Sequence, residues 1–307
     1  MSSIRWKTIS AFAAVYIIWG STYLAILIGI KTIPPFLMTA LRFLLAGLAL
    51  LIWRIIQRDR FPTINSFAKN SLVGALTLVG GVGSVGWAEQ YIPSSVAAII
   101  VTAVPFWFVL FDRKQWSFYF NNKIILTGLL FGFAGVAILV AFSHPGQQDQ
   151  SLEYRKIIGS LVILCGGIAW TTGSLYSKYG VLGHSLLMDA AIQFLSAGVI
   201  SLVISGLLGE WKGFQIERVS LESWLALIYL FTMGSLVAYL AYLWLIKNRP
   251  AAQVSSYVYV NPVIAVLLGA LLAHEIISWI QVLSLVIILI GVVMVNAPKY
   301  RHHAEKH

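Results

Sequence analysis

The stretch Met38-Thr39-Ala40-Leu41-Arg42-Phe43-Leu44-Leu45-Ala46-Gly47 is matched 151 residues later by Asp189-Ala190-Ala191-Ile192-Gln193-Phe194-Leu195-Ser196-Ala197-Gly198. Phe, Leu, Ala and Gly keep their register between the two, and the same offset places Trp19 on Trp170. Later matches follow in the same order: Pro93 with Pro250, Pro105 with Pro262, and Gly135 with Gly291. An ordered series of matches along a chain is the signature of an internal repeat. The sequence therefore predicts two similar halves.

Long apolar runs fill both halves. Of the 307 residues, 59% are hydrophobic and only 10% are charged, so a water-soluble domain could not cover its apolar surface. Continuous runs of about 18 apolar residues or more indicate transmembrane helices, whereas the strands of a membrane barrel alternate. Such runs lie near residues 8–29, 34–54, 70–88, 94–112, 124–142, 157–176, 186–208, 223–246, 250–273 and 279–297. We expect an all-α membrane protein with about ten transmembrane helices.

Each half contains five of these runs, which is an odd number, so the second half must enter the membrane from the opposite side. We expect a single membrane domain over residues 1–307, with a first repeat at 8–142 and a second at 156–297. Inverted repeats around a site near mid-membrane are common in secondary transporters, because the two halves can exchange conformations.

The formal net charge of +10 is sorted between the loops. If alternate loops face the same side, fifteen of the 21 Lys and Arg residues share the side of the N-terminus. The positive-inside rule assigns that side to the cytoplasm, so we expect both termini there and no nucleic-acid partner. The apolar stretch after Arg5 and Lys7 is too long for the apolar region of a signal peptide, and we interpret it as the first helix.

Aromatic and hydroxyl side chains gather at mid-span in the first helix of each half. They are Trp19, Ser21, Thr22 and Tyr23 in the first half, and Trp170 and Thr172 in the second. One explanation is packing, since small and hydroxyl-bearing residues let helices approach closely. The other is a substrate cavity, since transporter sites lie near mid-membrane.

The ninth run has polar side chains on one helical face. Tyr257 and Asn261 are four residues apart and share a face, and Tyr259 lies between them in sequence. A helix that faces lipid would not carry such a face, so we expect it to point into the bundle or a wet cavity.

Two prolines interrupt apolar runs. Pro262 lacks a backbone donor and frees the carbonyl of Val258, and Pro105 has the equivalent effect in the fourth run, next to Thr102. We expect a kink at each proline. The kinks can be purely structural, or they can serve gating and expose carbonyl groups to a substrate.

Three ionisable side chains lie within or beside the apolar runs. Arg42 is inside the second run, where a charge costs about 2.5–3.5 kcal/mol on insertion scales. Its repeat partner is the uncharged Gln193. Arg42 therefore either attracts an anionic substrate or holds helices together. Glu89 and Asp189, at helix ends, either titrate during transport or are solvated.

Motifs for other chemistry are missing from the sequence. It has no phosphate-binding Gly-Lys-Ser/Thr loop and no Gly-x-Ser-x-Gly nucleophile elbow. His274 and Glu275 begin a His-Glu-x-x-Ser stretch that lacks the second histidine of zinc proteases. Cys165 is the single cysteine, so no intrachain disulfide can form. We expect no enzyme activity, no cofactor and no metal site.

The motifs, taken in order, resemble a known family. They are Trp-Gly-Ser-Thr-Tyr at 19–23, Arg-Phe-Leu-x-Ala-Gly at 42–47, Pro-Ser-Ser-x-Ala-Ala at 93–98, Thr-Ala-Val-Pro at 102–105, Tyr-x-Asn-Pro-Val at 259–263, and Glu275. The chain resembles EamA-type members of the drug/metabolite transporter superfamily, more narrowly YedA-like bacterial inner-membrane exporters, over residues of about 8–297. Ala-His-Glu at 273–275 departs from the commoner Gly-Glu.

The resemblance implies a secondary transporter that exports small metabolites, such as amino acids or related amphipathic or toxic compounds, across the inner membrane by alternating access. The rival interpretations are a channel or facilitator and a membrane receptor or scaffold. The sequence leaves the oligomeric state open. The predicted substrate-binding residues are Trp19, Ser21, Thr22, Tyr23, Arg42, Thr102, Trp170, Thr172, Tyr257, Tyr259 and Asn261, with Pro105 and Pro262 as gating kinks and Glu89 or Asp189 for proton coupling.

Overall fold

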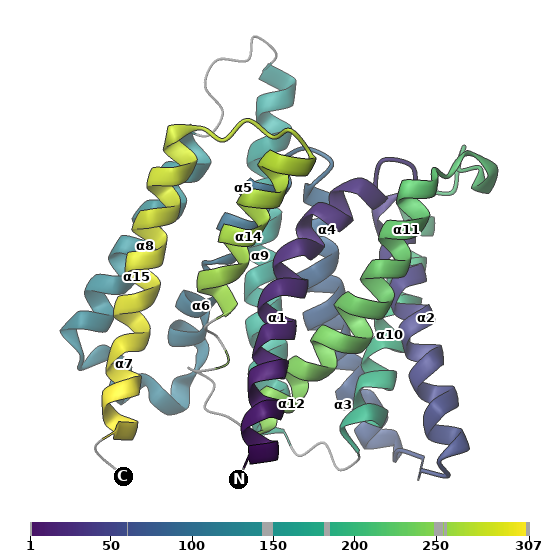
Figure 1. Ribbon diagram of the computed structural model, residues 1–307, viewed down its shortest axis with the longest axis horizontal. Coiled ribbons are helices and arrows are strands. Elements are labelled where there is room, and N and C mark those ends of the chain that lie inside the picture. The colour runs from purple at the N-terminus through teal and green to yellow at the C-terminus, as the bar shows by residue number, and fades with distance from the viewer. Residues whose placement is uncertain are drawn as a thin grey trace.

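The computed structural model describes residues 2–59, 61–142, 150–180, 185–248, 254 and 257–304. Every regular element in those ranges is a helix (Figure 1). The elements up to residue 142 are α1 (Ser2–Gly29), α2 (Pro35–Ile56), α3 (Ile64–Gly74), η1 (Ala75–Gly83), α4 (Ser84–Ala88), α5 (Ser94–Val101), α6 (Val104–Phe111), η2 (Arg113–Gln115), α7 (Trp116–Phe120) and α8 (Lys123–Phe142). The later ones are α9 (Gln150–Tyr179), α10 (Leu186–Leu207), η3 (Ile216–Arg218), α11 (Leu221–Tyr229), η4 (Leu230–Tyr239), α12 (Leu240–Asn248), α14 (Tyr257–Leu272) and α15 (Trp279–Ala304).

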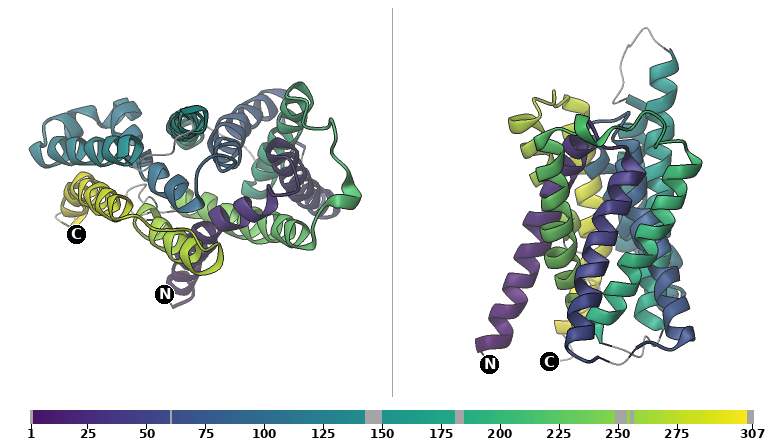
Figure 2. Two further views of the ribbon diagram at one scale, coloured as in Figure 1. Left: turned by 90° about the horizontal axis from the view of Figure 1, so that it is seen from above. Right: turned by 90° about the vertical axis from the view of Figure 1, so that its right-hand side faces the viewer.

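The helices run roughly side by side, and both chain ends lie at the same end of the bundle (Figure 1). At one edge α8 packs along α15, and at the other α2 packs along α10 (Figure 2, left). Between these pairs, α1 contacts α14 and η4, and α9 contacts η1 and α6. Helices from the two parts of the chain therefore alternate in space, and the space between them is lined by both.

By length and apolar composition, seven helical segments of the described residues can cross a membrane. They are Trp6–Gly29, Pro35–Ile56, Ile64–Ala88, Ser94–Phe111, Tyr154–Tyr179, Leu186–Leu207 and Leu221–Ile246. Three shorter apolar helices, Lys123–Leu139, Val260–Leu272 and Trp279–Val295, lie at the other three positions where the sequence predicts spans. At 1.5 Å per residue the shortest of these covers about 20 Å, less than the hydrocarbon core of about 30 Å.

The outer surfaces of the edge helices are apolar. Leu130 on α8, Leu207 on α10 and Val293 on α15 are each more than half exposed. Extended apolar surfaces of this kind are rare on monomeric soluble proteins. Hydrocarbon solvates them without cost, which is consistent with helices that face lipid.

Two of the membrane-crossing segments change from α- to π-helical geometry. The segment that begins with α3 continues as η1, and the segment that begins with α11 continues as η4. A π-helix closes its hydrogen bonds one residue later than an α-helix, so the face that each later residue presents is shifted. Both π-helical segments reach the middle of the bundle, where they contribute Gly81, Ser235 and Tyr239 to the cavity described below.

The two prolines that the sequence singles out have different surroundings. Pro105 lies in the first turn of α6, directly after α5 ends at Val101, so the fourth apolar run is divided into two helices. Pro262 lies inside α14, which continues past it. Pro262 therefore removes one hydrogen bond from the interior of its helix, whereas an N–H at position 105, in a first turn, would have no helical partner in any case.

Candidate functional site

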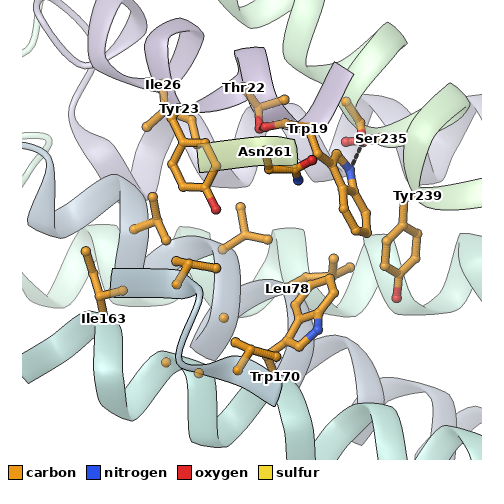
Figure 3. Close-up of a pocket in the computed structure, with 18 of the residues that line it drawn as sticks. Trp19, Thr22, Tyr23, Ile26, Leu78, Ile163, Trp170, Ser235, Tyr239 and Asn261 are labelled. Carbon is orange, nitrogen blue, oxygen red and sulfur yellow. Dashed lines mark hydrogen bonds between the residues drawn. The ribbon is translucent and has the colours of Figure 1, made fainter. Parts of the chain in front are cut away.

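A cavity of about 100 Å³ lies between the helices of the two parts of the chain. Seven of the predicted substrate-binding residues line it: Trp19, Thr22, Tyr23, Arg42, Trp170, Tyr257 and Asn261. Figure 3 shows Trp19, Thr22, Tyr23 and Asn261 on one side of the space, with Leu78, Ile163 and Trp170 opposite them. Side chains that are far apart in sequence therefore converge on one space.

Aromatic rings form one end of the cavity. The Trp19 ring centroid lies 5.7 Å from that of Trp170, 5.1 Å from that of Tyr242 and 5.3 Å from that of Tyr257. Trp19 meets Trp170 and Tyr257 edge to face, a favoured geometry worth about 0.5–1.5 kcal/mol per pair beyond area burial. The Trp19 indole N–H donates to the carbonyl oxygen of Gly234 at 3.3 Å, which fixes the ring against η4.

Arg42 places a positive charge on the cavity wall. Its side chain is only 5% exposed, its Nε donates to Ser235 Oγ at 2.9 Å, and its Cζ lies 5.0 Å from the centroid of the Phe43 ring. Among the residues that the structure describes, the one ion pair joins Arg54 to Asp59, neither of which lines the cavity. The guanidinium is therefore buried among neutral groups.

Asn261 contributes a polar group from α14. Its amide nitrogen donates to the carbonyl oxygens of Tyr16 (3.0 Å) and Tyr257 (3.1 Å), so both N–H groups of the carboxamide have an acceptor. That orientation leaves the amide oxygen to accept a bond from a solute. The side chain is 4% exposed and lines the cavity.

Three predicted residues do not line the cavity. The Ser21 hydroxyl lies 2.5 Å from that of Tyr229 on α11, Thr102 Oγ1 donates to the carbonyl oxygen of Ile99, and Thr172 is exposed on α9 and donates to Ile168. These hydroxyls are occupied by contacts within or between helices. The side chain of the fourth, Tyr259, lies outside the described part of the structure.

A buried polar chain that the sequence did not predict begins at the cavity. The Tyr239 hydroxyl donates to Gln193 Oε1 at 2.6 Å, Gln193 Nε2 donates to Asn70 Oδ1 at 2.9 Å, and Asn70 Nδ2 donates to Asp189 Oδ1 at 2.8 Å. Asp189 is thereby joined to the cavity wall through three side chains, those of Asn70, Gln193 and the wall residue Tyr239. The feature of the sequence that could have indicated this chain is the pair Tyr239 and Tyr242, two hydroxyl-bearing residues three positions apart in an apolar run.

Glu89 follows the apolar segment Ile64–Ala88 and is buried, with 3% exposure. Neither of its carboxyl oxygens has a hydrogen-bond partner among the described residues. It interacts electrostatically with Tyr23 on the cavity wall and with Glu275. Burial raises the pKa of Glu89 well above its ordinary value of 4.5, and the charge of Glu275 raises it further. The carboxyl therefore favours its neutral form in this conformation.

Glu275 joins the α14–α15 connection to the start of α5 at the end of the bundle opposite the termini. It lies between α14 and α15 and accepts three hydrogen bonds from the start of α5: Ser94 N at 2.9 Å, Ser94 Oγ at 2.6 Å and Ser95 N at 3.1 Å. A carboxylate here satisfies N–H groups that have no partner within the helix and complements the positive helix end. Glu210 does the same for α2, through Phe36 N at 3.2 Å and Leu37 N at 2.9 Å.

The described side chains contain no group of three or more His, Cys, Asp or Glu residues that could hold a metal ion. The lining of the cavity offers one cation, amide and hydroxyl groups, and aromatic faces.

A family model for the EamA-like transporter family matches residues 6–141 and again residues 157–297. Among curated proteins, the chain is 37% identical over 297 residues to the uncharacterized inner membrane transporter YedA of Escherichia coli (strain K12), which covers 96% of this chain and 92% of YedA. It is 22% identical over 295 residues to a probable amino-acid metabolite efflux pump of the same organism, with 90% of each chain covered.

The fold is also found among solved structures. One crystal structure superposes with a TM-score of 0.63 at 19% sequence identity, over 95% of this chain and 97% of the other. At that identity the likeness concerns the fold alone. Together with the two matches of the family model, it places the whole chain within one known architecture.

Proposed function

Since this chain belongs to the EamA-like transporter family, and is thus a multi-pass inner membrane transporter and not an enzyme, we propose that it exports small metabolites by alternating access, with the cavity around Trp19 and Arg42 as its substrate site. The observation that carries the proposal is a cavity between the helices that residues from both parts of the chain line. Such a space can open to either side when the parts move against each other.

The proposed mechanism requires ten spans arranged as two inverted repeats, residues 8–142 and 156–297, with both termini in the cytoplasm. Three observations support that arrangement. The family model matches once in each half, a π-helical segment occurs in the third span of each half, and both chain ends lie at the same end of the bundle. The packing of α1 against η4 and of α9 against η1 has the reciprocity that a two-fold relation would produce.

Counterflow into liposomes that hold the purified protein tests the function directly. A panel of labelled amino acids, a sugar and a cationic dye is offered outside, with unlabelled solute inside. We expect saturable uptake that depends on the internal solute, because a carrier exchanges its substrate across the membrane. Uptake that does not saturate and shows no counterflow would instead identify a channel. Flat traces from folded, inserted protein would argue against both.

We also propose that Glu89 carries a coupled proton. It interacts electrostatically both with the cavity residue Tyr23 and with Glu275, and it has no hydrogen-bond partner among the described residues. It would be neutral while buried and would ionise once the Glu275 end of the bundle opens to water. Asp189 is the alternative, although its carboxyl accepts a bond from Asn70.

Glu89→Gln is expected to change how stability depends on pH. The folded state raises the Glu89 pKa above 4.5, so it binds the Glu89 proton more tightly than the unfolded state does. The contribution of this proton to the stability of the wild type is complete below pH 4.5 and is lost as the pH rises toward the folded-state pKa. Glutamine has no proton to lose. The melting temperature of Glu89→Gln relative to wild type should therefore rise between about pH 5 and about pH 8.

The exposed Glu217 provides a matched control, because Glu217→Gln should leave the pH dependence of melting unchanged. Counterflow at both pH values completes the test, since a coupling role predicts that Glu89→Gln flattens the pH dependence of transport and that Asp189→Asn does not. If transport by Glu89→Gln keeps the wild-type pH profile, Glu89 is not the coupling group.

A further inference from the structure

Among the described residues that line the cavity, Arg42 carries the one formal charge. A guanidinium has five N–H donors in a planar fork. The structure gives one hydrogen bond to this side chain within the described residues, from Nε to Ser235 Oγ. A buried, largely unused cation usually pairs with an anion, because an isolated charge in a low-dielectric site is costly.

The equivalent position of the other half shows that packing alone does not need this charge. Gln193 matches Arg42 in the sequence repeat and lies on α10, which packs along α2. Both ends of its amide are used, by Tyr239 and Asn70. A neutral side chain therefore bridges helices at one position, and the charge at the other calls for a different explanation.

The remaining lining indicates the rest of the ligand. The cavity walls near Ile26, Leu78 and Ile163 are apolar, and Trp19 and Trp170 close one end. An apolar cavity of about 150 Å³ accommodates benzene, so a cavity of about 100 Å³ fits a smaller, aliphatic group. The amide oxygen of Asn261 can accept a bond from a donor on the same solute.

We propose that the cavity binds a small organic carboxylate with an apolar body, and that Arg42 binds the carboxylate in the bidentate geometry that a guanidinium favours. One cation matches one negative charge, so a monocarboxylate fits better than a phosphate ester of higher charge. This inference rests on the proposed function only in taking the cavity as the transport site.

Binding is tested with solutes that share a body and differ in one group. Leucine and 4-methylpentanoate are compared with their amides, leucinamide and 4-methylpentanamide, by quenching of tryptophan fluorescence, since Trp19 and Trp170 line the cavity. We expect each acid to bind about tenfold more tightly than its amide, or more, because charge-assisted hydrogen bonds are lost in the amide. Arg42→Gln should remove that difference, and Arg54→Gln, outside the cavity, should retain it.

Melting of each variant separates misfolding from lost binding. If Arg42→Gln does not fold, Ser235→Ala provides the second measurement: it keeps the charge, so the preference for acids should persist with weaker affinity. Equal binding of acid and amide by wild type would overturn the inference, as would an unchanged preference in folded Arg42→Gln.

Counterflow distinguishes this inference from the proposed function. Saturable counterflow of neutral or cationic solutes, with no inhibition by carboxylates, would support the transport function and reject the carboxylate site. Absence of counterflow for every solute, with acid-selective binding that depends on Arg42, would reject the transport function and retain the site.

Discussion

Gly291→Leu is expected to destabilise the protein by about 3 kcal/mol, the upper end of the usual cost of overpacking. A Cβ at position 291 would lie 2.6 Å from the carbonyl oxygen of Gly128 and 2.6 Å from the nitrogen of Gly132. Both are backbone atoms, so α8 and α15 would have to separate. Small residues at membrane helix contacts allow this close approach, and the two helices pack along each other at the edge of the bundle.

The measurement is thermal unfolding in detergent, followed by intrinsic tryptophan fluorescence. The melting temperature should fall by about 6–12 °C, given roughly 2–4 °C per kcal/mol for chains of comparable size. Gly206→Leu is the matched control, because Gly206 is exposed on α10 and a Cβ there meets only the Trp211 ring at 3.7 Å. Similar melting temperatures for the two variants would show that the α8–α15 contact does not limit stability.

The positions of the helices could be predicted from the sequence because apolar length is a direct physical requirement of the bilayer. The predicted runs near 34–54 and 186–208 correspond closely to α2 and α10. Convergence at the cavity could be predicted in part. Trp19, Trp170 and Asn261 meet because polar and amphipathic groups at mid-span have no favourable place facing lipid.

The remaining site residues could not be predicted because they depend on helix rotation and on contacts between distant segments. Trp170 lines the cavity, whereas Thr172, two residues later, is exposed on α9. A hydroxyl in the same sequence motif as a cavity residue therefore does not have to lie in the cavity. Along η4 the π-helical geometry shifts the face that each residue presents, so a period of 3.6 residues misplaces Tyr239. The role of Glu275 depends on Ser94, 181 residues away.

Glu275→Ala is expected to open the end of the bundle opposite the termini. The carboxylate accepts two backbone bonds and one hydroxyl bond from α5, and each hydrogen bond to a charged group is worth about 1.5–3 kcal/mol. Loss of about 3 kcal/mol from one state of a two-state equilibrium changes its population ratio by about a hundredfold. In the proposed alternating-access cycle, that shift favours the conformation in which this end is open.

Cysteine labelling in whole cells measures the opening. Cys165 is replaced by Ser, and Ile26, a buried residue of the cavity wall on α1, is replaced by Cys. With both termini in the cytoplasm, as proposed above, the Glu275 end faces the outside of the cell. A membrane-impermeant maleimide should therefore label Ile26→Cys much faster when Glu275→Ala opens that end.

Glu210→Ala is the decisive control, because Glu210 caps α2 through two backbone N–H groups just as Glu275 caps α5. The two caps differ in what they join. α2 is already held along its length by α10, whereas α5 is a helix of eight residues that ends at a break before α6. If capping merely stabilises helix ends, both variants will label at the wild-type rate. If the Glu275 contact holds the cavity closed, only Glu275→Ala will accelerate labelling. The contact between Glu275 and the start of α5 would then be the one that must break for this end to open during transport.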